Sequence, residues 1–257
     1  MNSSAPSELL GLTFERVRID DAVAQCLEWC CGPRTSHTVI TANASHLCMM
    51  QHDAALRRAC CAGNLIVADG MSVVWALRAA GTPVPERVAG VDLMDRLLEA
   101  GGRRGLRAYL LGARRHVVAA LAEKCPERYP GLEVAGWRDG YFPQTAHGEI
   151  VEEIHARAPH MLFVGMPSPF KETWSERHRE SLNVPVIMGV GGSFDVLAGF
   201  IQRAPALVQS IGMEWLWRLG KEPRKLWKRY LTLNSEFLWR GGKEILARRL
   251  GPSLHQT

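Results

Sequence analysis

Short apolar runs alternate with amphipathic stretches along the first 202 residues of the chain. The runs are four to seven residues long, which is typical of strands buried on both faces. The longer stretches repeat their apolar positions with the spacing of a helix. Predicted strands cover residues 38–41, 65–68, 108–111, 132–135, 161–164 and 184–190. Predicted helices lie between them, at residues 44–62, 70–80, 91–101, 115–129, 149–158 and 171–182.

This alternation indicates βαβ units wound around a parallel sheet. We therefore predict an α/β fold, with a Rossmann-like parallel sheet and helices on both of its faces. In such sheets, ligands bind beyond the carboxyl ends of the strands. The residues that follow each predicted strand are therefore the first candidates for a functional site.

Polar side chains follow the first two strands. Thr41 and Asn43 could hydrogen-bond a sugar or a phosphate, or they could satisfy their own turn. Asp69 could remove a proton from an attacking hydroxyl, or it could cap the helix that follows. Arg87 comes after a proline-rich turn, where it could pair with an anionic substrate group or remain solvated.

The last predicted strand runs into a glycine-rich turn at residues 189–194. The turn resembles a dinucleotide-binding glycine motif, but it has Phe194 at the third glycine position and lies late in the chain. The backbone N–H groups of Gly191 and Gly192 could still hold a phosphate or a ribose. Asp195 could bind a base or a ribose hydroxyl, or it could cap a helix.

The composition changes near residue 203. Residues 203–249 carry eleven Lys and Arg against four Asp and Glu, a local net charge of +7, whereas the whole chain has +5. Four of the eight tryptophans also lie there. We therefore predict a catalytic α/β domain over residues 1–202 and a basic, Trp-rich helical appendage over residues 203–257.

A basic helix rich in tryptophan favours a membrane surface or an anionic ligand. Lys225 and Lys228 would share one helix face, with Arg218 seven residues earlier. The alternatives are a helix packed on the core by its aromatic residues and a nucleic-acid-binding helix, for which no recognised motif is present. The apolar stripe of this helix consists of Leu226, Tyr230, Leu233 and Phe237.

The remaining composition sets limits on the class of protein. Hydrophobic residues make up 47% of the chain and charged residues 22%, as in ordinary globular proteins. The seven cysteines form no C-x-x-C pair, so we expect buried free thiols and a reducing cytoplasm. The N-terminus shows no signal peptide and no apolar run reaches spanning length, so we expect a protein that is neither exported nor integral to a membrane.

Together these residues resemble the WecG/TagA/CpsF glycosyltransferase family from about Val39 to Tyr230. The motifs that carry the resemblance are T-x-N at 41–43, A-D-G at 68–70, R-x-x-G at 87–90, G-x-P-x-P at 165–169, G-V-G-G-x-F-D at 189–195, R-A-P at 203–205 and E-W-x-x-R-L…E-P at 214–223. Their order and spacing are specific, although no single element is decisive.

The resemblance implies an inverting, metal-independent enzyme that needs no cofactor. Members move a sugar, often N-acetylmannosamine or in some relatives glucose, from its UDP form to an undecaprenyl-diphosphate-linked sugar. The resemblance also implies that Asp69 is the general base, that Thr41 lies beside the reacting sugar and that Arg218 belongs to a basic tail that reaches the diphosphate. The same tail would dock the enzyme on the inner face of the bacterial plasma membrane.

Two departures from the family pattern concern substrate contacts. Lys171 precedes Glu172 where many members have Gln, which predicts a different donor or acceptor contact. Lys225 and Lys228 stand where arginine is common, and lysine keeps the charge but loses the bidentate phosphate geometry.

We therefore expect a UDP-sugar-dependent transferase of exopolysaccharide or cell-envelope synthesis, with an anionic membrane surface as a partner and no nucleic acid. The sequence does not decide whether the protein forms a homo-oligomer. The competing hypotheses are a nucleotide-binding oxidoreductase, which the incomplete glycine motif disfavours, and a non-enzymatic basic membrane adaptor. The polar residues gathered at several strand ends disfavour the adaptor.

Overall fold

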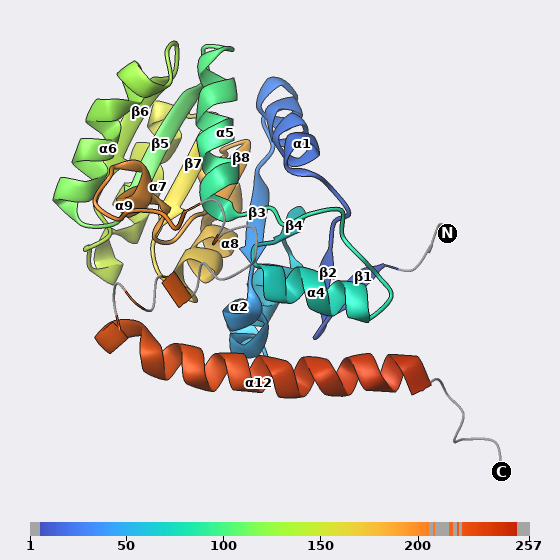
Figure 1. Cartoon of the computed structure of the whole chain (residues 1–257). Helices are drawn as coiled ribbons and strands as arrows, with labels where there is room; N and C mark the ends of the chain where they lie inside the picture. The colour runs from blue at the N-terminus through green and yellow to red at the C-terminus, as the bar shows by residue number, and fades with distance from the viewer. Residues whose placement is uncertain (1–5, 206–207, 209–215, 218–219, 221–222, 251–257) are drawn as a thin grey trace.

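The six apolar runs form one parallel sheet in the computed structural model, which describes residues 6–205, 208, 216–217, 220 and 223–250. The strands are β3 (His37–Ala42), β4 (Leu65–Ala68), β5 (Arg107–Gly112), β6 (Glu133–Arg138), β7 (Met161–Gly165) and β8 (Val186–Gly189). Their order across the sheet is β4-β3-β8-β7-β5-β6 (Figure 1). The predicted α/β class is confirmed.

Helices cover both faces of this sheet, because successive strand residues point to opposite sides. They are α1 (Ile19–Cys31), α2 (Ala44–Met49), α3 (Ala54–Cys61), α4 (Met71–Ala79), α5 (Gly90–Gly102), α6 (Arg115–Arg128), α7 (His147–Arg157), α8 (Phe170–Leu182) and α9 (Ser193–Leu197), with a 3₁₀ turn, η1 (Gln144–Ala146). Val39 packs with α1, α5, α6 and α9 on one face. Ile40 packs with α2, α3 and α4 on the other face, which α7 and α8 continue toward β7.

The predicted helix over residues 44–62 is wrong, since the chain breaks there into α2 and α3. Asp53 begins the second helix, and its carboxylate accepts hydrogen bonds from the backbone N–H groups of Ala55 and Leu56, both at 2.9 Å. An aspartate in this N-cap role is a strong start signal that the apolar periodicity alone conceals.

The apolar pattern predicts no element before β3. This part of the chain forms a hairpin of β1 (Ser7–Leu9) and β2 (Leu12–Phe14), followed by α1. The strands are only three residues long and turn through Leu10 and Gly11, both with positive φ. Strands this short carry too little alternation to be recognised.

All seven cysteines are free, and five of them are buried. Burial raises the pKa of the Cys30 and Cys60 thiols to about 12, which keeps both protonated and unreactive near neutral pH. Cys31 and Cys61 are exposed, so the expectation of buried thiols holds for the majority and not for all.

The basic C-terminal stretch contains a long helix, α12 (Pro223–Leu250), which passes beside α2 and α4 (Figure 1). Phe237 is buried in the apolar cluster of those helices, and Leu233 packs against the same cluster. The opposite side of the helix exposes Trp239 and Leu246. Packing on the core and an exposed apolar face are therefore both present, on different sides of one helix. Leu226 and Tyr230 of the predicted stripe have side chains outside the described part of the structure.

Within the described part of the chain, no helix is both long enough and apolar enough to cross a membrane.

Candidate functional site

Thr41, Asn43 and Asp69 lie together at the carboxyl edge of the sheet. Strands β3 and β4 pair in parallel, with Ala42 opposite Ala68, and the N–H of Asp69 donates to the carbonyl of Ala42 at 2.9 Å. The two strands therefore end side by side. The sequence predicted that a site would lie beyond the strand ends, and the structure adds that these two strands are neighbours.

Gly90, the first residue of α5, lies against both Thr41 and Asp69. A methyl group on Gly90 would lie 3.0 Å from Thr41 Oγ1 and 3.5 Å from Asp69 Oδ2. The hydroxyl and the carboxylate thus approach the same backbone position at a helix N-terminus. Thr41 is buried, whereas Asp69 is half-buried.

The residue at the N-cap of α4 is Gly70, not Asp69. The alternative prediction, in which Asp69 serves as that N-cap, is therefore wrong. Gly70 has φ 155°, a conformation that side-chain-bearing residues rarely adopt. The chain turns at this glycine directly after the carboxylate.

Asn43 satisfies its own turn, the second of the two roles that its position allows. Its side-chain oxygen accepts the backbone N–H of His46 at 3.2 Å, which caps α2. In return, His46 Nδ1 accepts the N–H of Asn43 at 3.4 Å, so each residue satisfies the other's backbone. The side-chain oxygen of Asn43 is therefore engaged in a hydrogen bond within the fold, at the edge of the site.

Arg87 is not simply solvated, because its side chain is only 15% exposed and its Nη2 lies 3.9 Å from Asp92 Oδ2. Asp92 also forms a two-pronged ion pair with Arg203, which includes an Nη2–Oδ2 distance of 2.6 Å. Arg203 begins the R-A-P segment at the predicted start of the appendage. The ion pair therefore joins that segment to the first turn of α5, two residues from Gly90.

Lys171 is buried rather than open to a ligand. Its ammonium pairs with Glu172 Oε1 and lies 3.2 Å from His46 Nε2. Glu172 Oε1 also contacts His46 Nε2 and the Ser168 hydroxyl, each at 2.8 Å. Burial alone would raise the pKa of the Glu172 carboxyl. The hydrogen bond from His46 and the charge of Lys171 outweigh it and hold this pKa below its usual range.

The sequence patterns did not identify His46 as a member of this cluster. The available signal was its position three residues after Asn43, the spacing of a capping box. Its partner Glu172 is 126 residues away, and no local pattern links the two.

The glycine turn after β8 lies beside the same cluster. Gly191 has φ 51° and lies near the Lys171 stem, and Gly192 is the N-cap of α9. Asp195 is half-buried in the first turn of α9, so it is not the capping residue. Phe194 is buried with its ring against Gly165, which explains why an aromatic residue occupies the third position of the glycine motif.

The structure describes the three basic residues predicted in the appendage only in part. Arg218 lies outside the described residues. Lys225 and Lys228 fall within the first turns of α12, but their side chains are not described. Their contact with a ligand stays a prediction.

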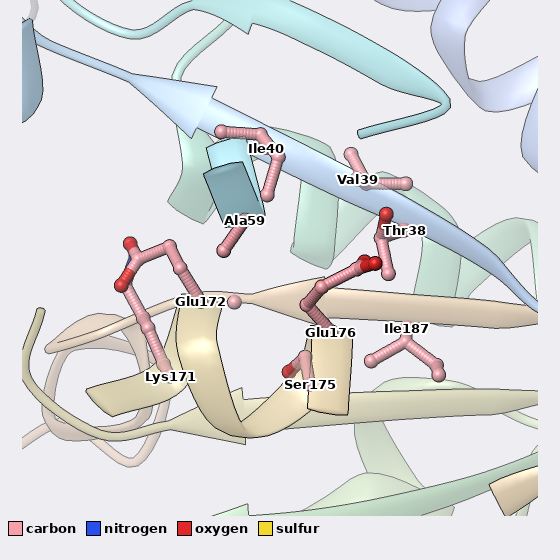
Figure 2. Close-up of a pocket in the computed structure, with 10 residues that line it drawn as sticks. Thr38, Val39, Ile40, Ala59, Lys171, Glu172, Ser175, Glu176 and Ile187 are labelled. Carbon is pink, nitrogen blue, oxygen red and sulfur yellow. The ribbon is translucent and has the colours of Figure 1, made fainter. Parts of the chain in front are cut away.

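A small cavity lies between α8 and the sheet (Figure 2). It is lined by Lys171, Glu172, Ser175 and Glu176 of α8 and by residues of β3 and β8. Its volume of about 10 Å³ is near the lower limit for one water molecule, so it cannot admit a sugar. Figure 2 shows the Glu172 carboxylate meeting Lys171, while the Glu176 carboxylate points toward Thr38. In the described chain, no group of three or more His, Cys, Asp or Glu side chains could hold a metal ion.

A parallel sheet that places a carboxylate, a hydroxyl and an arginine beyond its carboxyl edge defines an α/β protein with a polar edge at the position where such sheets generally bind ligands. The chain belongs to the glycosyl transferase WecG/TagA/CpsF family, whose model matches residues 7–251. It is also 35% identical, over 170 residues, to an N-acetylglucosaminyldiphosphoundecaprenol N-acetyl-beta-D-mannosaminyltransferase of Bacillus spizizenii. That alignment covers 66% of this chain and 65% of the relative's own length.

Proposed function

We propose that this protein is an inverting glycosyltransferase that moves a hexose or N-acetylhexosamine from a UDP-sugar to a sugar linked to undecaprenyl diphosphate. The observation that carries the proposal is the approach of the Asp69 carboxylate and the Thr41 hydroxyl to Gly90 at the carboxyl edge of the sheet. Family membership supports the transfer of a sugar. The name of the Bacillus relative favours N-acetylmannosamine as the sugar and a lipid-diphosphate-linked N-acetylglucosamine as the acceptor, with glucose as the other donor sugar to test.

In this reaction, an acceptor hydroxyl attacks the anomeric carbon of the donor sugar. Asp69 takes the hydroxyl proton, the new glycosidic bond forms, and the bond to the UDP oxygen breaks. Thr41, beside Asp69, is placed to hydrogen-bond the reacting sugar. UDP leaves with an increased negative charge, which nearby cations would stabilise.

Cations for this purpose are available on both sides of the proposed domain boundary. Arg87 lies close to the carboxyl edge, and Arg218, Lys225 and Lys228 belong to the basic segment that continues from the Arg203–Asp92 ion pair. Preorganised positive groups can stabilise a diphosphate leaving group as a metal ion would. We therefore expect transfer to continue in EDTA.

The acceptor lipid requires the enzyme to work at a membrane surface. The exposed Trp239 and Leu246 of α12, together with the local charge of +7, support peripheral binding to an anionic leaflet. We place the protein at the cytoplasmic face of the plasma membrane, in the synthesis of an exopolysaccharide or another cell-envelope polymer.

Purified protein should be tested for transfer from UDP-N-acetylmannosamine and from UDP-glucose to a short-chain polyprenyl-diphosphate N-acetylglucosamine, with and without EDTA. We expect transfer from one of these donors and an increase of the melting temperature with UDP. Protection by NAD instead of UDP would favour an oxidoreductase. Protection by neither nucleotide, without transfer, would favour a non-enzymatic adaptor.

A further inference from the structure

Four polar side chains meet in the interior, next to the proposed site. They come from the first turn of α2 and from the β7–α8 turn with the start of α8, and they are His46, Ser168, Lys171 and Glu172. The side chains of His46 and Glu172 are 8% and 1% exposed. Polar groups buried this deeply destabilise a fold unless they are paired, so their arrangement is constrained.

The hydrogen bonds define the orientation of the His46 ring. Its Nδ1 accepts the backbone N–H of Asn43, so the proton of the neutral ring is on Nε2. Nε2 then donates to Glu172 Oε1 at 2.8 Å. One imidazole thus connects the backbone at Asn43 to a carboxylate on another helix.

Both ends of this connection lie against elements of the proposed site. Asn43 is two residues after Thr41, at the end of β3. Glu172 holds the ammonium of Lys171, whose stem lies against the glycine turn: a methyl group on Gly189 would lie 3.0 Å from Lys171 Cδ. The His46–Glu172 contact therefore links the turn that carries Thr41 to the turn after β8.

We propose that His46 and Glu172 are a positioning pair of the active site, which sets Thr41 and Asn43 relative to the Gly189–Gly192 turn. Neither side chain touches substrate in this proposal; the pair acts through Asn43 on one side and Lys171 on the other. The inference rests on the proposed glycosyl transfer. If the pair is broken, the turn at Asn43 loses its link to α8, and displacements of about 1 Å near reacting atoms cost about 100-fold in rate.

Two substitutions of His46 separate positioning from packing. His46→Leu keeps most of the volume but donates no hydrogen bond. His46→Gln keeps a donor for Glu172 and an acceptor for the Asn43 N–H, because glutamine at this helix position completes a capping box. We expect His46→Leu to lower kcat by about 10- to 100-fold with little change in donor KM, and His46→Gln to stay within about threefold of wild type.

His155→Gln is the matched control, since His155 lies on α7 and contacts only the carbonyl of Ser181 among the hydrogen bonds described for its side chain. It should leave kcat unchanged. Each rate is divided by the folded fraction from the melting curve. Full kcat in His46→Leu, or equal losses in the Leu and Gln variants, would overturn the proposal. If His46→Leu does not fold, His46→Asn takes its place, because asparagine is too short to reach Glu172 and should show the same loss.

A double substitution tests whether His46 acts through Glu172. If it does, His46→Leu combined with Glu172→Gln should lower kcat no further than the more severe single substitution, since both remove one interaction. Additive losses would contradict the pairing. The wild-type protein separates this test from the proposed function: if it transfers no sugar, glycosyl transfer fails, whereas an active wild type with additive variants rejects the positioning pair alone.

Discussion

Asp69 carries the chemical step of the proposed reaction at the scale of a single residue. Asp69→Asn removes the proton acceptor and keeps the size of the side chain. Loss of a general base costs about 10²- to 10⁴-fold in rate, so we expect kcat to fall by that factor. UDP should still raise the melting temperature, because nucleotide binding does not need the base. Near-normal turnover by the purified variant would remove Asp69 from this role.

Gly90 allows a second test, in which a substitution should lower the activity without lowering the stability. Alanine at this first helical position favours the helix, by up to about 1 kcal/mol, so Gly90→Ala should not lower the melting temperature. The added methyl group would meet Thr41 Oγ1 at 3.0 Å and force a shift of a few tenths of an ångström. We expect kcat to fall by up to about tenfold, since small misplacements near reacting atoms are costly. A variant that is both stable and fully active would show that this edge tolerates crowding.

The residues that the sequence could identify are those whose neighbourhood follows from topology. Thr41 and Asp69 lie at the carboxyl ends of two predicted strands, and their proximity follows once the structure shows that β3 and β4 pair in parallel. The partners of Asp92 and His46 could not be found in this way. Arg203 is 111 residues from Asp92, and long-range contacts of this kind depend on how helices pack.

At the scale of elements, strands were easier to predict than helix ends. Continuous apolar runs mark strands that are buried on both faces, and all six appear in the sheet. Helix ends depend on single capping residues. Asp53 divides the predicted helix 44–62, and the periodicity on both sides of it gave no indication of the break.

The link between α2 and α8 predicts how the fold responds to acid. The pKa of Glu172 is lower in the folded chain than its ordinary value of 4.5. As the pH falls, Glu172 therefore binds a proton at a higher pH in the unfolded chain than in the folded chain. The stabilisation by Glu172 is complete above about pH 4.5 and is lost as the pH falls toward the folded pKa. One such group contributes a slope of at most about 1.4 kcal/mol per pH unit.

Glu172→Gln should remove this slope and also lower the free energy of unfolding at neutral pH by about 3 kcal/mol, because it leaves Lys171 buried without its partner. Denaturant unfolding between pH 3 and pH 7 measures both effects. Glu176→Gln is the control, since its partly exposed pair with Arg179 at 3.6 Å is worth less than about 1 kcal/mol. Parallel pH profiles for wild type and Glu172→Gln would contradict the assigned ion pair.

At the scale of the whole molecule, the charge is divided between two ends of the chain. Residues 203–249 carry +7, whereas the complete chain carries +5, so the α/β part is slightly acidic. Composition alone predicted this basic segment, but it could not tell which helix side faces the core. The structure resolves that question within α12, where Phe237 is buried and Trp239 is exposed.

Trp239, Lys243 and Leu246 lie on one face of α12, opposite Phe237, and the Lys243 ammonium is 4.0 Å from the centre of the Trp239 ring. If this face docks on lipid, Trp239→Ala with Leu246→Ala should weaken binding to vesicles of phosphatidylglycerol and phosphatidylcholine by at least about tenfold. Burying either side chain is worth about 1.5–3 kcal/mol, and 1.4 kcal/mol corresponds to a factor of ten.

The double variant should keep wild-type stability and wild-type turnover of a short, soluble acceptor, because it leaves the buried side of α12 intact. Trp137→Ala on β6, at the opposite edge of the sheet from β4, is the control and should bind vesicles as wild type does. Unchanged vesicle binding by the double variant would exclude this face of α12 from membrane docking, and lost turnover of the soluble acceptor would place these side chains in the site itself.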